Sequence, residues 1–123
     1  MYVHDELTEQ IIGCAIEVHK ALGPGLLEAT YEKGLCLELA QSGLPFDQQF
    51  RVSIAYKGHP IGEYRPDLVV ASRVLVEIKS VDRLIGLHRA QALSYMRVLK
   101  LRVGLILNFN TEVLRSGIIR LVL

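Results

Sequence analysis

Two amphipathic helices are predicted in the first third of the chain. Within residues 5–21, apolar side chains recur on one helical face, and they are Leu7, Ile11, Cys14, Ala15 and Val18. The Gly23-Pro24-Gly25 segment ends this helix, because glycine and proline both disfavour its continuation. A second helix is expected from about Leu26 to Ser42, ahead of Gly43. Its inward side chains are Tyr31, Leu35 and Leu39.

The spacing of apolar residues changes from helical to alternating after residue 49. Phe50, Val52, Ile54 and Tyr56 alternate with polar residues, which is typical of a half-buried strand. Turns are predicted at residues 57–60 and 71–73. Further strands are expected over residues 61–70, 74–80 and 103–109, and a last one over residues 118–122.

One more helix is predicted over residues 84–100, with Leu84, Leu87, Gln91, Tyr95 and Val98 on its apolar stripe. The first three strands should form an antiparallel meander. The helix is then a crossover, which makes strand 103–109 parallel to one of them. The predicted fold class is α/β, a mixed sheet flanked by helices. Its order is two helices, three strands, one helix and one or two strands.

The composition fits one domain over residues 1–123. Half of the residues are hydrophobic, yet no apolar run approaches the roughly 18 to 20 residues of a membrane span. The first ten residues, MYVHDELTEQ, lack the order of a signal peptide, so a cytoplasmic location is expected. Cys14 and Cys36 have no metal-site spacing, and we expect two buried free thiols.

Charge is distributed unevenly between the two halves of the chain. Residues 1–50 hold two lysines against eight acids, a net charge of −6. Residues 51–123 hold twelve lysines and arginines against five acids, a net charge of +7. The basic half fits a polyanionic partner such as nucleic acid. Equally, the two halves can neutralise each other in the fold.

The predicted strand 74–80 carries two opposite charges, Glu77 and Lys79, in an otherwise apolar sequence. Side chains alternate along a strand, so both charges share a face with Leu75. Burying them costs several kcal/mol each unless they are paired or bound to an ion. The turn at 71–73 can bring Asp67 of the preceding strand near Glu77. The alternative is an ion pair at the edge of a hairpin.

These residue types suit divalent-metal chemistry. Mg²⁺ prefers oxygen ligands and commonly takes one or two carboxylates, with waters and a phosphate completing its shell. Asp67 and Glu77 would supply the carboxylates, and the carbonyl of Ile78 would help. Lys79 beside the metal could contact a phosphate and orient or deprotonate a water. Metal, activated water and held phosphate are the requirements of phosphodiester hydrolysis.

The same residues carry a resemblance to a known family. Pro66-Asp67, nine residues and then Glu77-Ile78-Lys79 resemble the signature of the PD-(D/E)XK nuclease superfamily. The segment from Gly25 to Tyr31, GLLEATY, is similar to the motif that names its GxxExxY family. The similarity runs from about Ile11 to about Phe109. It includes Gln91 with Tyr95 and Asn108-Phe109, and it departs where Asn110 follows this pair in place of the family's usual glycine.

The resemblance implies a restriction-endonuclease-like core and a metal-dependent nuclease. In such proteins the positions of Asp67 and Glu77 bind Mg²⁺ or Mn²⁺, and the position of Lys79 serves catalysis. Glu28, on the preceding helix, would complete the acidic cluster as a metal ligand or as the partner of Lys79. Gln91 would lie beside the site. The expected product of cleavage carries a 5′-phosphate.

Several of these residues also have purely structural explanations. Glu28 falls in the first turn of its helix, where a carboxylate favours the helix dipole and can cap free N–H groups. Gln91 can be a satisfied core amide. Tyr31 is better explained by core packing with a tethered hydroxyl than by catalysis. His88 could contact phosphate or simply lie on the surface.

Three functions are compatible with the sequence. The first is a nuclease that acts on DNA or RNA through Asp67, Glu77, Lys79 and Glu28. The second is a non-catalytic nucleic-acid-binding module that keeps the nuclease fold, because few residues remain outside the core for target recognition. The third is a homodimeric assembly module that uses apolar surface such as the C-terminal IIRLVL segment. Because every residue of the site signature is present, we rank catalysis first.

Overall fold

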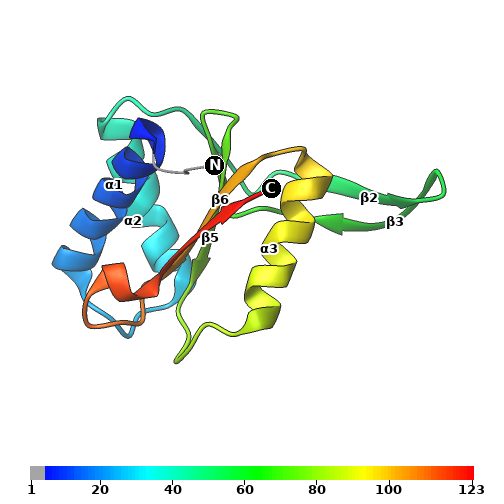
Figure 1. Cartoon of the computed structure of the whole chain (residues 1–123). Helices are drawn as coiled ribbons and strands as arrows, with labels where there is room; N and C mark the ends of the chain where they lie inside the picture. Colours follow the sequence, from blue (N-terminus) through cyan, green and yellow to red (C-terminus); the bar gives the residue numbers. More distant parts are fainter. Residues whose placement is uncertain (1–4) are drawn as a thin grey trace.

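The computed structural model describes residues 5–123 and is shown in Figure 1. Helix α1 begins after Asp5, whose carboxylate accepts a hydrogen bond from the Thr8 N–H at 2.7 Å and so caps the first turn. In chain order the elements are α1 (Glu6–Leu22), α2 (Glu28–Gln41), β1 (Phe46–Gln48), β2 (Val52–Tyr56), β3 (His59–Tyr64), β4 (Leu68–Val70), β5 (Val74–Lys79), α3 (Gly86–Leu99), β6 (Val103–Asn108), the 3₁₀ turn η1 (Leu114–Gly117) and β7 (Ile118–Val122).

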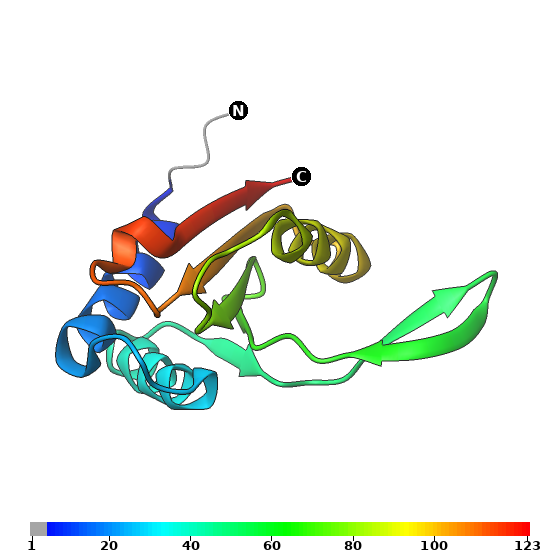
Figure 2. The ribbon, with the colours of Figure 1, turned by 90° about the horizontal axis from the view of Figure 1, so that it is seen from below.

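Five strands form a mixed sheet in the order β1-β4-β5-β6-β7. Strands β5 and β6 are parallel and joined through α3, while the other neighbouring pairs are antiparallel. Helices α1 and α2 cover one face of this sheet and α3 covers the other (Figure 2). The predicted mixed sheet, its crossover helix and its last strand are therefore confirmed, and β5 is the central strand.

The two faces of β5 follow the predicted alternation. Val76 and Ile78 pack in the core beneath α1 and α2, whereas Leu75 packs beneath α3 with Met96. Glu77 and Lys79 alternate with Leu75 and so belong to the face that α3 covers. The two charged residues of the central strand, Glu77 and Lys79, therefore lie near the end of β5 on the face that α3 covers.

The rotation of α3 differs from the prediction. Its buried side chains are Ala92 and Met96, while Leu87 is 61% exposed and Gln91 is exposed as well. Gly104 of β6 explains this orientation, because a Cβ atom there would lie 2.7 Å from the Met96 sulfur. The glycine lets Met96 approach the sheet closely. With Met96 facing inward, the predicted apolar stripe that contains Leu87 and Gln91 is turned partly toward solvent.

The predicted three-stranded meander was also wrong in one respect. The expected strand 61–70 is interrupted by Arg65-Pro66-Asp67, which divides it into β3 and β4. Strands β2 and β3 form a separate two-stranded sheet that projects from the body (Figure 1). The place beside β4 is taken by β1, an unpredicted strand. Proline lacks an N–H for a sheet ladder, which accounts for the break.

Smaller expectations have mixed outcomes. Both cysteines are free, Cys14 buried and Cys36 partly buried. The IIRLVL segment mostly forms β7, with Leu121 buried and Val122 exposed, rather than a free apolar surface. Within residues 5–123 no helix is sufficiently long and apolar to span a lipid bilayer.

Ion pairs join the acidic first part of the chain to the basic second part at two places. Arg73 lies 3.6 Å from Asp5, and Arg120 pairs with Glu9. The two halves therefore neutralise each other in part. Lys57, Arg65 and Lys79 make no salt bridge within the part of the chain that the structure describes, and they remain available to a polyanion.

Candidate active site

Asp67 and Glu77 face each other across β4 and β5. The two strands are joined by the three residues 71–73, in a turn where the Arg73 N–H donates to the Val70 carbonyl at 3.0 Å and both Ala71 and Ser72 have positive φ. This turn sets a register that pairs Leu68 with Val76, so the next residues outward are Asp67 and Glu77. The Ile78 N–H donates to Asp67 Oδ2 at 2.8 Å, and the Asp67 N–H donates to Glu77 Oε2 at 3.2 Å.

The Glu77 carboxyl is held in a largely dry environment. Its residue is 8% exposed, and its Oε1 atom accepts a hydrogen bond from the Tyr64 hydroxyl at 2.6 Å. Burial, and then the negative charge of Asp67, raise the pKa of Glu77 to about 7. Tyr64 stacks on Tyr95 of α3 with ring centroids 3.5 Å apart. Burial and the Glu77 charge raise the pKa of the Tyr64 phenol, so it remains a hydrogen-bond donor.

Asp67 has a raised pKa for a related reason. Burial is the main cause, and the nearby charge of Glu32 adds to it, whereas the hydrogen bond from the Ile78 N–H opposes the rise. The charge of Asp67 in turn raises the pKa of Glu77, after burial. A cation close to both carboxyl groups would favour their ionised forms.

Lys79 lies two residues beyond Glu77 on the same strand. It is the last residue of β5 and half-buried, and its charge lowers the pKa of Glu77. Its ammonium group makes neither a salt bridge nor a hydrogen bond within residues 5–123. The alternative of an ion pair at the edge of the hairpin is therefore wrong: within residues 5–123 neither Glu77 nor Asp67 makes a salt bridge, and Glu77 accepts hydrogen bonds from Tyr64 and from the Asp67 N–H.

Glu28 contacts the residue that follows Lys79 at the end of β5. It is the first residue of α2, and its Oε2 atom accepts a hydrogen bond from the Ser80 N–H at 3.2 Å. The Ser80 hydroxyl donates to the Leu26 carbonyl at 2.6 Å, so the start of α2 is fastened to the residue after Lys79. Glu28 does not cap its own helix.

The expected trio of acids is not assembled. Among the described residues, no three His, Cys, Asp or Glu side chains are grouped so that they could hold a metal ion. Asp67 and Glu77 are brought together, and Glu28 lies with Ser80 instead, since its carboxylate is occupied there.

A second buried acid, Glu32, braces Asp67 and was not predicted as a site residue. Glu32 is 8% exposed and accepts hydrogen bonds from Gln48 at 2.6 Å and from Gln49 at 3.0 Å. The same Gln49 nitrogen lies 3.1 Å from Asp67 Oδ1. Gln49 holds a positive φ of 52°, which non-glycine residues seldom adopt. The one signal in the sequence was the placement of Glu32 one turn after Glu28, on the inward side of α2.

The supporting residues named from the sequence have structural contacts. Tyr31 is fully buried, stacks on Phe109 at 4.5 Å, and donates its hydroxyl proton to the Gly23 carbonyl at 2.6 Å. The expectation of core packing with a tethered hydroxyl is confirmed. His88 Nδ1 accepts a hydrogen bond from the Ile85 N–H at 3.1 Å, at the start of α3. Gln91 is exposed on α3, so it is not a core amide.

Asn108 holds the backbone that follows Lys79. Its side chain accepts a hydrogen bond from the Val81 N–H at 3.1 Å and donates to the Val81 carbonyl at 3.0 Å. The Phe109 N–H donates to the Lys79 carbonyl at 2.9 Å. The end of β5 is therefore fixed from β6 as well as from α2.

The chain matches one known protein family over nearly its whole length. The family model described as the PD-(D/E)XK nuclease superfamily matches residues 5–121. The chain belongs to the PD-(D/E)XK nuclease superfamily. No curated protein and no solved structure matches the chain. Members of the superfamily generally use divalent metal ions.

The donor atoms at the Asp67–Glu77 pair fit such an ion. Both are hard carboxylate oxygens, and a PD-(D/E)XK protein that binds Mg²⁺ needs only one or two carboxylates because waters complete the shell. Burial is the main cause of the raised pKa of both acids, and the charge of Asp67 adds to that of Glu77. Both carboxyl groups are therefore of the kind that a divalent cation binds, and Lys79 lies two residues beyond Glu77.

We expect the metal-free protein to lose stability as the pH rises. Glu77 has a folded-state pKa of about 7, above its usual value of 4.5. The folded state therefore holds the proton more tightly, and this contribution is complete below pH 4.5 and lost as the pH passes about 7. Urea unfolding in EDTA across this range measures it. Glu77→Gln should make the free energy of unfolding depend less on pH. An unchanged pH dependence in that variant would contradict the raised pKa of Glu77.

Tyr64→Phe should destabilise the protein by about 1–3 kcal/mol at pH 8, because it leaves a buried Glu77 oxygen without its donor. Tyr95→Phe is the matched control: it keeps the aromatic stack and removes a hydroxyl that makes no hydrogen bond within residues 5–123. Chemical denaturation of both variants gives the comparison. Equal losses in the two would show that the Tyr64–Glu77 hydrogen bond contributes little.

Proposed function

We propose that this protein is a metal-dependent nuclease of the GxxExxY group that hydrolyses phosphodiester bonds of nucleic acid. The observation that carries the proposal is that a carboxyl pair, Asp67 and Glu77, lies near Lys79, whose ammonium group makes no salt bridge or hydrogen bond within residues 5–123. Membership of the nuclease superfamily supports it. The GLLEATY segment that contains Glu28 supports the subgroup.

In this proposal Asp67 and Glu77 bind Mg²⁺ or Mn²⁺. The ion supplies Lewis-acid stabilisation of the charge that develops on the phosphoryl oxygens. Lys79 contacts the phosphate and orients the attacking water in line with the leaving oxygen. Glu28 holds the Ser80 N–H and thereby sets the position of the strand end from which Lys79 projects.

Other residues would keep these groups in place. Tyr64 fixes one oxygen of Glu77, and Gln49 fixes one oxygen of Asp67 while it is itself held by Glu32. Such bracing restricts the carboxylates to a narrow range of orientations, which favours a metal-bound geometry. His88 and Gln91 lie on α3 and would contact the substrate rather than the metal.

The decisive assay incubates purified protein with single- and double-stranded DNA and RNA in the presence of Mg²⁺ or Mn²⁺. Lys79→Ala and Asp67→Ala should each lower the rate constant of cleavage by about 10²–10⁴-fold, since each removes an interaction of the transition state. Lys33→Ala, an exposed change on α2, serves as the control and should cleave like the wild type.

Persistence of cleavage in both Lys79→Ala and Asp67→Ala would end the proposal. A second function, nucleic-acid binding without cleavage, is favoured by one observation: all four oxygens of Asp67 and Glu77 already accept a hydrogen bond. This second function would be favoured if the wild type bound nucleic acid in a salt-dependent manner but cleaved none with either metal.

A further inference from the structure

The β2–β3 hairpin is an arm that the body of the protein supports only at its root. Figures 1 and 2 show it extending away from the main sheet and its helices. At the root, Phe50 packs into the core beneath α3, and Tyr64 stacks on Tyr95. Farther out, Tyr56 and Ile61 are 60% and 64% exposed. Isolated two-stranded hairpins are marginally stable in water, so the outer arm gains from a partner.

The root of the arm lies in the candidate active site. Tyr64, the last residue of β3, donates its hydroxyl proton to Glu77. The chain then passes through Arg65 and Pro66 directly to Asp67. A phosphate placed at Asp67 and Glu77 would therefore have its flanking nucleotides beside the arm. At about 3.3 Å per residue, the six residues of β3 extend roughly 20 Å from that point.

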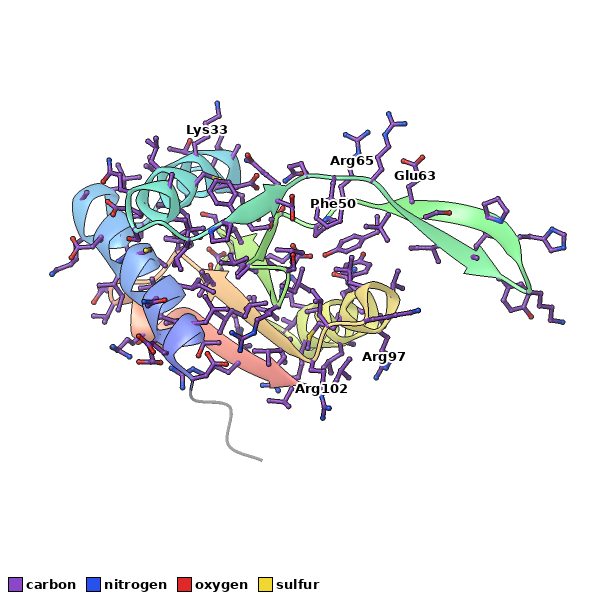
Figure 3. The ribbon with its side chains drawn as sticks, turned by 90° about the horizontal axis from the view of Figure 1, so that it is seen from above. Lys33, Phe50, Glu63, Arg65, Arg97 and Arg102 are labelled. Atoms are coloured by element: carbon purple, nitrogen blue, oxygen red, sulfur yellow. The ribbon has the colours of Figure 1, made fainter. Side chains whose placement is uncertain are left out.

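The charge of the arm suits a polyanion. Residues 50–65 hold three cations, Arg51, Lys57 and Arg65, against the single acid Glu63. Glu63 lies 3.9 Å from Arg51, which leaves Lys57 at the tip and Arg65 at the root without a salt bridge in the described chain. Figure 3 shows Arg65 and Glu63 projecting from the same side of the arm. A second copy of the same arm would add cations instead of compensating them.

The shape of the arm distinguishes between nucleic acids. Its paired strands are about 4.8 Å apart, and with side chains such a ribbon matches the roughly 12 Å width of the B-DNA major groove. The major groove of an A-form RNA duplex is deep and narrow and does not admit it. Tyr56 and Ile61 offer apolar contacts of the kind that thymine methyl groups accept.

We propose that the β2–β3 arm enters the major groove of a B-form DNA duplex whose phosphodiester bond lies at Asp67 and Glu77. The inference rests on the proposed nuclease function for its orientation and names duplex DNA as the substrate class. Lys57 and Arg65 bind phosphates on the two sides of the groove. The arm thereby positions the duplex over the acidic pair.

Fluorescence anisotropy in EDTA measures binding without cleavage. Wild-type protein should bind a DNA duplex at least tenfold more tightly than an RNA duplex of the same sequence. Lys57→Gln/Arg65→Gln should weaken DNA binding at least tenfold. It should also reduce the slope of log affinity against log salt concentration by about 2, since each phosphate contact contributes about 0.9. Circular dichroism and thermal unfolding establish that the variant is folded.

The matched control is Lys20→Gln/Arg115→Gln. Both residues are exposed and line one pocket beside η1, away from the arm (Figure 1), and their loss removes the same charge. This control should bind DNA like the wild type. The proposal is overturned if the arm variant binds like the control or if RNA duplex binds as tightly as DNA. If the arm variant has half the solution mass of the wild type and an unchanged DNA affinity, the arm binds a second copy of the chain instead of DNA.

Failure of the arm proposal and failure of the nuclease proposal give different results. If binding depends on the arm but no metal supports cleavage, the arm proposal stands and the nuclease proposal fails. If the wild type cleaves DNA and the arm variant binds and cleaves equally well, the nuclease proposal stands and the arm proposal fails.

Discussion

The burial of the Glu77 carboxyl group beside the partly buried Asp67 is the constraint on which the rest of the site depends. Removing two acids from water costs several kcal/mol unless donors or a cation compensate. Here the donors come from three places: the strands themselves, Tyr64 at the root of the arm, and Gln49 in the link between β1 and β2. The arm and that link are thereby both anchored at the acidic pair.

The same constraint connects stability with chemistry. Raised pKa values mean that the folded protein favours either protonated acids or a nearby positive charge. Lys79 supplies part of that charge from the same face of β5, and its backbone is held by Phe109 while Ser80 is held by Glu28. This cost of ionisation is what the proposed divalent cation would offset.

Local patterns in the sequence were sufficient for α1, α2 and the central strands, and the turn at 71–73 correctly predicted that Asp67 lies near Glu77. The remaining features depend on contacts between elements that are distant in the sequence. Alternation at residues 50–56 is the same whether the strand joins the main sheet or projects as an arm. The Glu32–Gln49 bond joins residues 17 apart and needs β1 to pair with β4. Two stripes of α3 could face inward, and Gly104 selects the one containing Met96.

Metal binding at the acidic pair can be tested by anomalous diffraction from crystals soaked in Mn²⁺, with Glu77→Gln crystals as the comparison. We expect an anomalous peak between the carboxyl groups of Asp67 and Glu77 in the wild type, and its loss in the variant. A wild-type crystal that binds Mn²⁺ only elsewhere, or a peak that survives in Glu77→Gln, would contradict this expectation.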